Sequence, residues 1–150
     1  MVIRGYANVY TLPPDVMHSE DLLEAERYAR ENKLGLWAET LNPYSIGLFL
    51  NFDAEGDDRE NLNGEYLILR NEDTSDHNIK GWTVKDSGTS IYEFKRFVFS
   101  KGAEITLFTG NGRDGNGIFY WNSNMPVWNN DHDMIYLRDR EGLLIEYFNY

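Results

Sequence analysis

From Ile46 to the C-terminus the chain is a series of short runs rich in β-branched and aromatic residues, separated by turn-forming residues. The eight runs cover residues 46–52, 65–70, 79–85, 91–99, 104–109, 118–121, 134–138 and 143–148. Pairs such as Asn63-Gly64 and Glu141-Gly142 stand between them, and such pairs form tight turns readily. Seven to nine short strands within about a hundred residues are typical of a β-sandwich. We therefore predict a mainly β domain of two packed antiparallel sheets over residues 46–150.

Alternation within several runs indicates that their strands have two different faces. In residues 66–70, Leu67 and Leu69 face one side while the residues between them face the other. In residues 134–138, Tyr136 faces away from the two apolar residues beside it. This pattern fits strands that turn one face toward a shared core.

The first forty residues follow a different pattern, with a helical period between Ser19 and Gly35. Leu22, Ala25 and Ala29 lie three or four residues apart and so share one face of a helix. Ser19 can cap the first turn, and Gly35 is a suitable C-terminal stop. The sequence therefore predicts one helix with an apolar face.

A short strand and a turn precede this helix in the prediction. Residues 2–10 have the pattern of a strand, and Pro13-Pro14 predicts a rigid turn. Because one strand and one helix cannot enclose a core, we divide the chain into an N-terminal appendage, residues 1–41, and the sandwich, residues 46–150. The apolar helix face then needs a cover, either from the sandwich or from a neighbouring chain, as in an exchanged homodimer through residues 1–41.

The composition excludes several classes of partner. The chain has 25 acidic and 14 basic residues and a net charge of −11, so its average surface repels nucleic acid and anionic lipid headgroups. It contains no cysteine, which excludes disulfides and thiolate zinc sites. Its apolar stretches are far shorter than the ~20 residues that cross a membrane. No leader pattern follows Met1, and we expect no membrane insertion.

Residues 46–150 resemble the lamin tail domain family in the order of their motifs. The matching units are Gly64-Glu65-Tyr66 with Asn71, Gly81-Trp82 with Asp86, Tyr92, Phe94, Gly102, Thr109-Gly110, Trp121, and Pro126-Val127-Trp128-Asn129-Asn130 with Asp133 and Leu137. The resemblance implies an immunoglobulin-like sandwich. Members of the family occur fused to nucleases and other exported hydrolases. The resemblance thus implies an accessory module with a protein or cell-surface ligand, in an extracellular or cell-surface parent protein.

Residues 2–38 resemble the C-terminal end of a staphylococcal-nuclease-like domain. The residues that carry this resemblance are Arg4, Gly5, Ala7, Pro14, Glu26, Ala29, Leu36 and Trp37. Such nucleases hydrolyse phosphodiesters with calcium held by carboxylates and with arginines on the phosphate. The resemblance implies that those residues belong to a barrel before Met1, since Arg4 matches a late-strand arginine rather than a phosphate-binding one. We therefore expect no catalysis by this chain itself.

Three tryptophans have a structural interpretation, and two of them also have a binding interpretation. Trp82 follows Gly81 within a run, where a sandwich core takes one large aromatic residue. Trp121 and Trp128 flank a proline-containing loop, and an exposed pair there could stack on a sugar or a peptide. The alternative, which we favour, is a hydrophobic cluster that anchors the loop.

Acidic residues in the loop after the first run are a candidate calcium site. Asp53, Asp57 and Asp58 flank Gly56, and hard cations take several carboxylate oxygens. The spacing does not match an EF-hand loop, and a solvated acidic loop explains the same residues. We favour the solvated loop and expect no obligatory cofactor.

No catalytic constellation is recognisable in the sequence. His18, His77 and His132 lie in loops without a partner at metal or catalytic spacing, so we expect them to be solvent-exposed. The glycine-rich loop over residues 110–117 lacks the Lys-Ser/Thr of a phosphate-binding loop. The sequence favours a non-catalytic interaction or localisation module of a nuclease-fusion protein. The alternatives are a metal-dependent nuclease and a carbohydrate- or cell-envelope-binding module.

Overall fold

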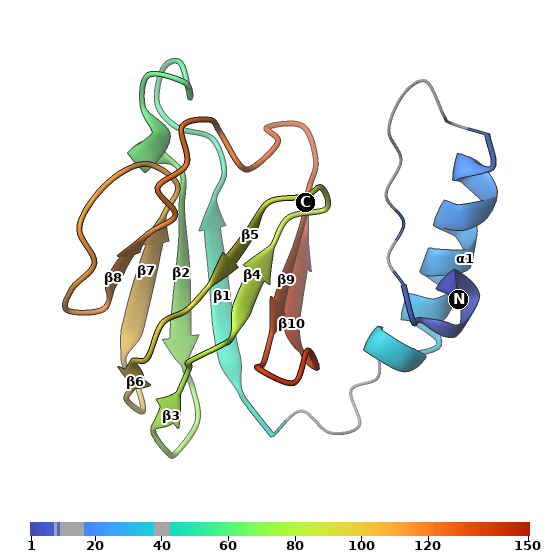
Figure 1. Ribbon diagram of the computed structural model, residues 1–150, viewed down its shortest axis with the longest axis horizontal. Coiled ribbons are helices and arrows are strands. Elements are labelled where there is room, and N and C mark those ends of the chain that lie inside the picture. Colours follow the sequence, from blue (N-terminus) through green and yellow to red (C-terminus); the bar gives the residue numbers. More distant parts are fainter. Residues whose placement is uncertain (8, 10–16, 38–42) are drawn as a thin grey trace.

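The computed structural model describes residues 1–7, 9, 17–37 and 43–150 (Figure 1). The strands are β1 (Ile46–Asn51), β2 (Tyr66–Asn71), β3 (His77–Asn78), β4 (Thr83–Lys85), β5 (Ile91–Glu93), β6 (Val98–Phe99), β7 (Glu104–Phe108), β8 (Ile118–Tyr120), β9 (Met134–Arg138) and β10 (Leu144–Asn149). The helices are α1 (Ser19–Glu31) and three short 3-10 helices, η1 (Val2–Arg4), η2 (Gly35–Trp37) and η3 (Leu62–Gly64). The turn predicted at Pro13-Pro14 lies outside the described residues.

The strands form a sandwich of two four-stranded sheets with a small third sheet at one end (Figure 1). One sheet has the order β1-β2-β7-β8, and the other has the order β10-β9-β4-β5. Strands β3 and β6 pair separately. The named pairs are antiparallel except β7 and β8, which run parallel. The mainly β, immunoglobulin-like sandwich predicted from the sequence is confirmed, with one parallel pair that was not predicted.

The core lies between the two sheets and consists of the inward side chains of their strands. Leu67 and Leu69 of β2 are buried against Ile135 and Leu137 of β9 in one cluster. Trp82, predicted to be a core residue, is only 2% exposed. Each of these side chains contributes roughly 1.5–3 kcal/mol by leaving water. The cluster draws all its described members from the sandwich, so this part of the chain has a core of its own.

Turns shorten two of the predicted strands. Within residues 79–85 only β4 is a strand, because Gly81 has a φ of 82° and the Trp82 amide donates to the Ile79 carbonyl in a turn. Residues 91–99 divide into β5 and β6. Strand β3 pairs with β6 and is absent from the prediction, since two residues are too few to show an alternation.

The strand predicted over residues 2–10 is wrong at its start, because Val2–Arg4 form a 3-10 helix, and residues 8 and 10 lie outside the described residues. Gly5 closes this helix with a φ of 70°, and its amide donates to the Val2 carbonyl at 2.7 Å. A β-carbon on Gly5 would lie 1.8 Å from the carbonyl oxygen of Leu34. The glycine therefore allows η1 to pack directly on the backbone that follows α1.

Helix α1 matches the predicted segment but differs from it at both ends. His18, rather than Ser19, occupies the N-cap position, and its side chain makes no capping hydrogen bond. The helix ends at Glu31, four residues before the predicted stop at Gly35. Lys33 already has a φ of 53°, which is incompatible with a continuing helix.

Candidate functional site

The N-terminal segment packs against the outer face of the sheet that contains β9 and β10 (Figure 1). Tyr136 of β9 points away from the core, as its place in the alternation predicted, yet it is only 3% exposed. The Trp37 ring covers it at a centroid distance of 5.5 Å, and Ala29 of α1 completes the cluster. The helix is therefore docked on its own sandwich near its C-terminal end. Leu22, near the other end, remains 40% exposed.

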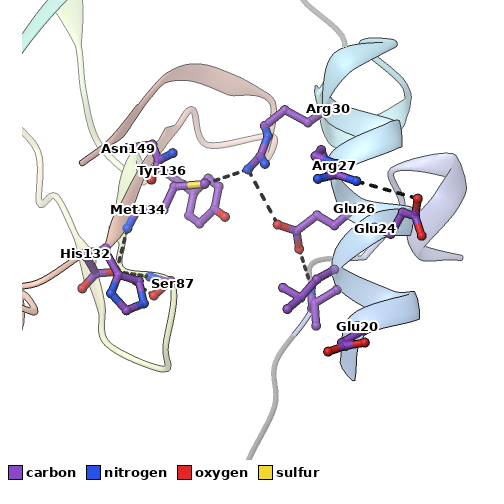
Figure 2. Close-up of a pocket in the computed structure, with 13 residues that line it drawn as sticks. Glu20, Glu24, Glu26, Arg27, Arg30, Ser87, His132, Met134, Tyr136 and Asn149 are labelled. Carbon is purple, nitrogen blue, oxygen red and sulfur yellow. Dashed lines mark hydrogen bonds and ion pairs between the residues drawn. The ribbon is translucent and has the colours of Figure 1, made fainter. Parts of the chain in front are cut away.

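A polar contact joins α1 to β9 beside this cluster (Figure 2). The Glu26 carboxylate is largely buried, accepts the Val9 amide at 2.6 Å and lies 3.9 Å from Arg30. The same Arg30 nitrogen donates to the sulfur of Met134 at 3.4 Å. Burial, and after it the charge of Glu26, raise the pKa of Tyr136 well above its ordinary value. The phenol at this contact is therefore neutral at physiological pH.

A cavity of about 660 Å³ opens next to this contact, between α1 and the sandwich. Glu20, Glu24 and Arg27 line it from the helix, and Ser87 and His132 line it from the sandwich (Figure 2). The lining mixes charged side chains with apolar ones such as Leu23 and Met134, and the hydroxyl and imidazole side chains lie at the sandwich end.

Ser87, His132 and Asp133 all line that end of the cavity, but they are not arranged as a catalytic triad. The Ser87 hydroxyl donates to Asp133 Oδ1 at 2.6 Å, so the carboxylate rather than the imidazole holds its proton. Activation of a serine needs a neighbouring general base with a matched pKa, a role that histidine usually fills. His132 is exposed and does not take this place.

Asp133 instead holds three backbone segments together. Its buried carboxylate accepts the amides of Ser87 at 3.0 Å, Asn129 at 3.2 Å and Met134 at 2.7 Å. Its own amide and carbonyl pair with those of Tyr150 at 3.3 Å. Asp133 thus fixes the loop before β9 to the turn after β4 and to the end of the chain.

The acidic loop does not bring the three candidate calcium ligands together. Asp58 accepts the Ala54 amide at 3.1 Å and the Asn130 side chain at 2.6 Å, and Asp57 accepts the Arg59 amide at 3.0 Å. Within the described part of the chain, no three acidic or histidine side chains are grouped so that they could hold a metal ion. The Asp58 carboxylate therefore ties the loop to the segment that follows Trp128.

The two loop tryptophans differ in their accessibility. Trp128 is 4% exposed and belongs to the core cluster, so its ring is not available for stacking on a ligand. Trp121 is half-buried and contacts Trp128 edge-on at 5.7 Å and Tyr92 at 5.7 Å. Burial, followed by the charge of Asp114, raises the pKa of Tyr92 to about 12. Of the predicted pair, only Trp121 keeps an accessible ring.

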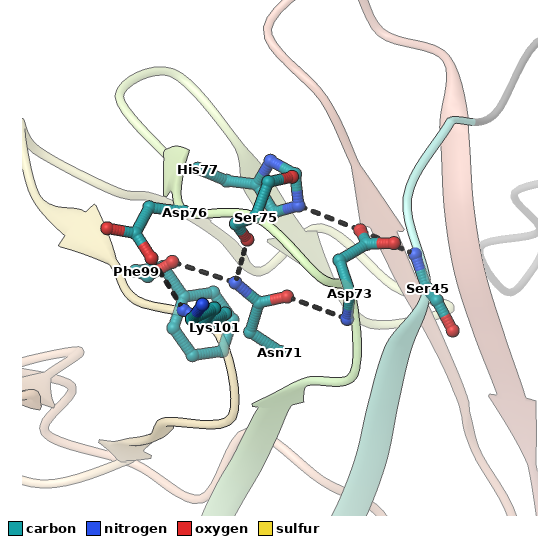
Figure 3. A network of polar contacts seen from close by, with 8 residues as sticks. All are labelled: Ser45, Asn71, Asp73, Ser75, Asp76, His77, Phe99 and Lys101. Carbon is teal, nitrogen blue, oxygen red and sulfur yellow. Dashed lines mark hydrogen bonds and ion pairs between the residues drawn. The ribbon is translucent and has the colours of Figure 1, made fainter.

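His77 is half-buried and contacts Asp73 (Figure 3), in contrast to the predicted solvent-exposed side chain. Its side chain is 14% exposed, and Nε2 lies 2.7 Å from a carboxylate oxygen of Asp73. The ring also stacks near Trp82 at 6.3 Å. The hydrogen bond from the Ser45 amide lowers the pKa of Asp73, and the contact with His77 lowers it further by a smaller amount. The prediction failed because it did not pair His77 with Asp73, four residues earlier in the chain. This carboxylate fixes the imidazole ring against Trp82 of the core.

Asn71 is the centre of the same network (Figure 3). Its amide nitrogen donates to the carbonyls of Ser75 at 3.0 Å and Phe99 at 2.8 Å, and its oxygen accepts the Asp73 amide at 3.0 Å. Asn71 is fully buried, so these bonds replace those that it loses with water. The network fixes the β2–β3 turn and has a structural role.

Glu65 is a buried carboxylate that is not among the site residues predicted from the sequence. It is 0% exposed, and its Oε2 accepts the Val127 amide at 3.2 Å. Burial raises the pKa of Glu65, and the hydrogen bond from Val127 opposes this effect. The alternation could have found it, because Glu65 has the same parity as Leu67 and Leu69 and therefore faces inward.

Comparison with known families identifies two parts of the chain. Among the described residues, no helix has the length and apolarity needed to span a membrane. The family profile of the Staphylococcal nuclease homologue matches residues 1–39, and that of the Lamin Tail Domain matches residues 50–150. A search of curated proteins finds no match. Both resemblances inferred from the sequence are confirmed, and the chain belongs to the lamin tail domain family.

Proposed function

We propose that this chain is a non-catalytic interaction or localisation module associated with a nuclease. The observation that carries the proposal is the unequal extent of the two family matches. The lamin tail domain accounts for residues 50–150, whereas the nuclease family accounts for residues 1–39 only. The module would hold its parent protein at a ligand outside the cell or at the cell surface.

The chemistry of the described surfaces supports a binding role. The Ser87 hydroxyl and the Asp133 carboxylate are committed to each other, and Asp58 is committed to its own loop and to Asn130. The net charge of −11 disfavours direct contact with nucleic acid. A structural contact therefore explains each of these three side chains.

The nuclease match also supplies a second candidate function, metal-dependent cleavage by the chain itself. Both functions can be tested on the purified 150-residue protein with single-stranded DNA and RNA in millimolar Ca²⁺. We expect no cleavage above the level given by buffer alone. Cleavage that a chelator abolishes would overturn the non-catalytic proposal and support the second function.

A second experiment measures whether cell-envelope material retains the chain. A fluorescent protein fused to the full chain is mixed with a washed cell-envelope preparation and sedimented, with the fluorescent protein alone as the control. We expect the fusion in the pellet and the control in the supernatant. Equal amounts of both in the supernatant would contradict a cell-surface ligand.

A further inference from the structure

An accessible row of aromatic rings crosses the outer face of the sheet formed by β1, β2, β7 and β8. The register places Tyr66 of β2 opposite Phe108 of β7, and Phe108 opposite Tyr120 of β8. Phe49 of β1 lies opposite Ile68 and so contacts the Tyr66 ring diagonally. Successive ring centroids lie 6.4, 5.7 and 5.4 Å apart. These four residues are called the aromatic row below.

The aromatic row is accessible and its rings are held in place. Phe49 is 56% exposed, the other three rings are half-buried, and Ile118 beside them is 40% exposed. The ring of Tyr120 stacks on that of Phe108 with an interplanar angle of 23°. A β-carbon on Gly112 would lie 2.2 Å from the Tyr120 ring, so the loop backbone rests against that ring. A surface fixed in this way loses little side-chain entropy when it binds.

The outward positions of the four strands that carry the aromatic row are balanced in charge, although the chain is strongly acidic, and Glu72 beside them adds one negative charge. The four strands of this sheet are fully described, and their outward positions carry only two charged side chains, Arg70 and Glu104. These two form an ion pair at 3.9 Å. Charge complementarity therefore favours an uncharged ligand over a polyanion or a polycation.

A shallow depression of about 210 Å³ lies beside the aromatic row. Phe49, Arg70, Glu72 and Glu104 line it, and Gly47 leaves it open, because a β-carbon there would lie 2.8 Å from a Glu72 carboxylate oxygen. The guanidinium offers several hydrogen-bond donors and the carboxylates offer acceptors. An apolar strip with donors and acceptors at its side matches a ligand with apolar faces and hydroxyl edges.

The size of this face argues against a second protein as its occupant. With strands about 4.8 Å apart and a rise of about 3.3 Å per residue, four strands of up to six residues present roughly 300 Å². A stable protein interface buries about 800 Å² of accessible surface on each partner, so a second chain would have to contact the loops around this face as well. A narrow, extended ligand fits the face better than a second copy of this chain does.

We propose that the aromatic row binds a neutral, extended polysaccharide, with sugar rings against successive aromatic rings and with Arg70 and Glu104 contacting hydroxyl groups. This inference rests on the proposed function as a binding module and gives that function a class of ligand and a surface. The aromatic row then takes the place of Trp121 and Trp128 as the carbohydrate-contacting surface.

Pelleting with microcrystalline cellulose and with chitin tests the proposal on the full chain, and polygalacturonate in affinity electrophoresis serves as the anionic probe. We expect retention on at least one neutral polymer and none on the anionic one. Phe49→Ala should weaken retention at least ten-fold, and Phe49→Trp should preserve it. Ile91→Ala is the matched control, because Ile91 is 58% exposed on the other sheet. Melting temperatures establish that each variant is folded.

Three results would overturn the glycan assignment: no retention on either neutral polymer, retention that Phe49→Ala leaves unchanged, or dimerisation that Phe49→Ala abolishes. None of them touches the proposed function. Its non-catalytic part fails only if the purified chain cleaves nucleic acid, and its cell-surface ligand fails if the fusion is not retained by envelope material. A chain that binds envelope material but neither polymer would keep the proposed function and lose this ligand.

Discussion

Folding disfavours the charged form of Glu65. Its carboxylate is fully buried, and burial raises its pKa above the ordinary value of 4.5. The folded state therefore binds the proton more tightly than the unfolded state does. The stability gained from this proton is fully present below the ordinary pKa and is lost as the pH rises through the raised pKa.

Glu65→Gln should remove this pH dependence. The glutamine oxygen keeps an acceptor for the Val127 amide and carries no charge at any pH. We expect the free energy of unfolding of the variant, relative to the wild type, to increase between pH 4.5 and pH 7. Urea unfolding at the two pH values measures this difference. The contributions of the other carboxylates cancel, because the variant and the wild type both contain them.

Glu65→Ala is the matched comparison for this prediction. It leaves the buried Val127 amide without its acceptor, at a cost of about 1–3 kcal/mol. A pH-independent difference between the glutamine variant and the wild type would mean that Glu65 has the same pKa in both states.

Asp58 is predicted to act through its hydrogen bonds and not through a metal ion. Asp58→Ala removes two bonds of about 1 kcal/mol each, those to Ala54 and Asn130, and should lower the melting temperature by several degrees. Asp53→Ala should have little effect, because that carboxylate makes no hydrogen bond within the described part of the chain. A rise in the wild-type melting temperature in millimolar Ca²⁺, reversed by a chelator, would contradict this prediction.

At the scale of the elements, the contact between α1 and the sandwich depends on a few long side chains. Trp37 contacts Tyr136 and also lies 6.1 Å from Tyr147 at an interplanar angle of 80°. Arg30 lies over the Trp37 ring at 5.6 Å. The Trp37 indole nitrogen is buried, and it has no hydrogen-bond partner in the described part of the chain. The ring, rather than its N–H group, therefore stabilises the docked helix.

Trp37→Ala and Trp37→Phe should separate these two contributions. The alanine variant loses a buried aromatic side chain, a change that costs about 3–5 kcal/mol in a core, and α1 should detach. The phenylalanine variant keeps a ring and loses an unpaired donor, so α1 should stay docked. Hydrogen exchange of the α1 amides reports detachment directly. Equal protection of α1 in the wild type and the alanine variant would show that the helix does not depend on Trp37.

The helices and strands also show which parts of the fold can be predicted from the sequence. The sandwich strands were predictable because alternation within β2 and β9 reports a face that is buried locally. The docking of Tyr136 was not predictable, because it depends on Trp37, which is distant in the chain. The 3-10 helix at Val2–Arg4 was missed for a similar reason, since Gly5, which ends it, packs against the distant backbone of Leu34. Outward aromatic residues in four separate runs were a visible signal for the aromatic row, but only the register aligns them.

At the scale of the whole molecule, the core of the sandwich contains no described residue of the appendage. A chain without residues 1–41 should therefore keep its β structure, as measured by circular dichroism and thermal unfolding. Its association or solubility should change, because the deletion uncovers Tyr136 and its neighbours. Loss of the β structure on deletion would place α1 within the folding unit of the sandwich.

Self-association through residues 1–41 stays a prediction. Leu23 and Tyr28 of α1 are 55% and 50% exposed, which leaves apolar surface for a second chain. Sedimentation of the full chain over a range of concentrations, with Leu23→Glu as the comparison, measures it. Association that Leu23→Glu does not reduce would assign the contact to another surface.

The N-terminal segment and the aromatic row lie on opposite sides of the sandwich, because each uses the outer face of a different sheet. A polymer bound on one side would leave the other side untouched, so the two contacts would not compete for surface. A catalytic domain joined through the N-terminal side would then work as a tethered reagent, at an effective concentration set by its linker. Such a module would govern where a nuclease acts and leave the rate of its chemistry unchanged.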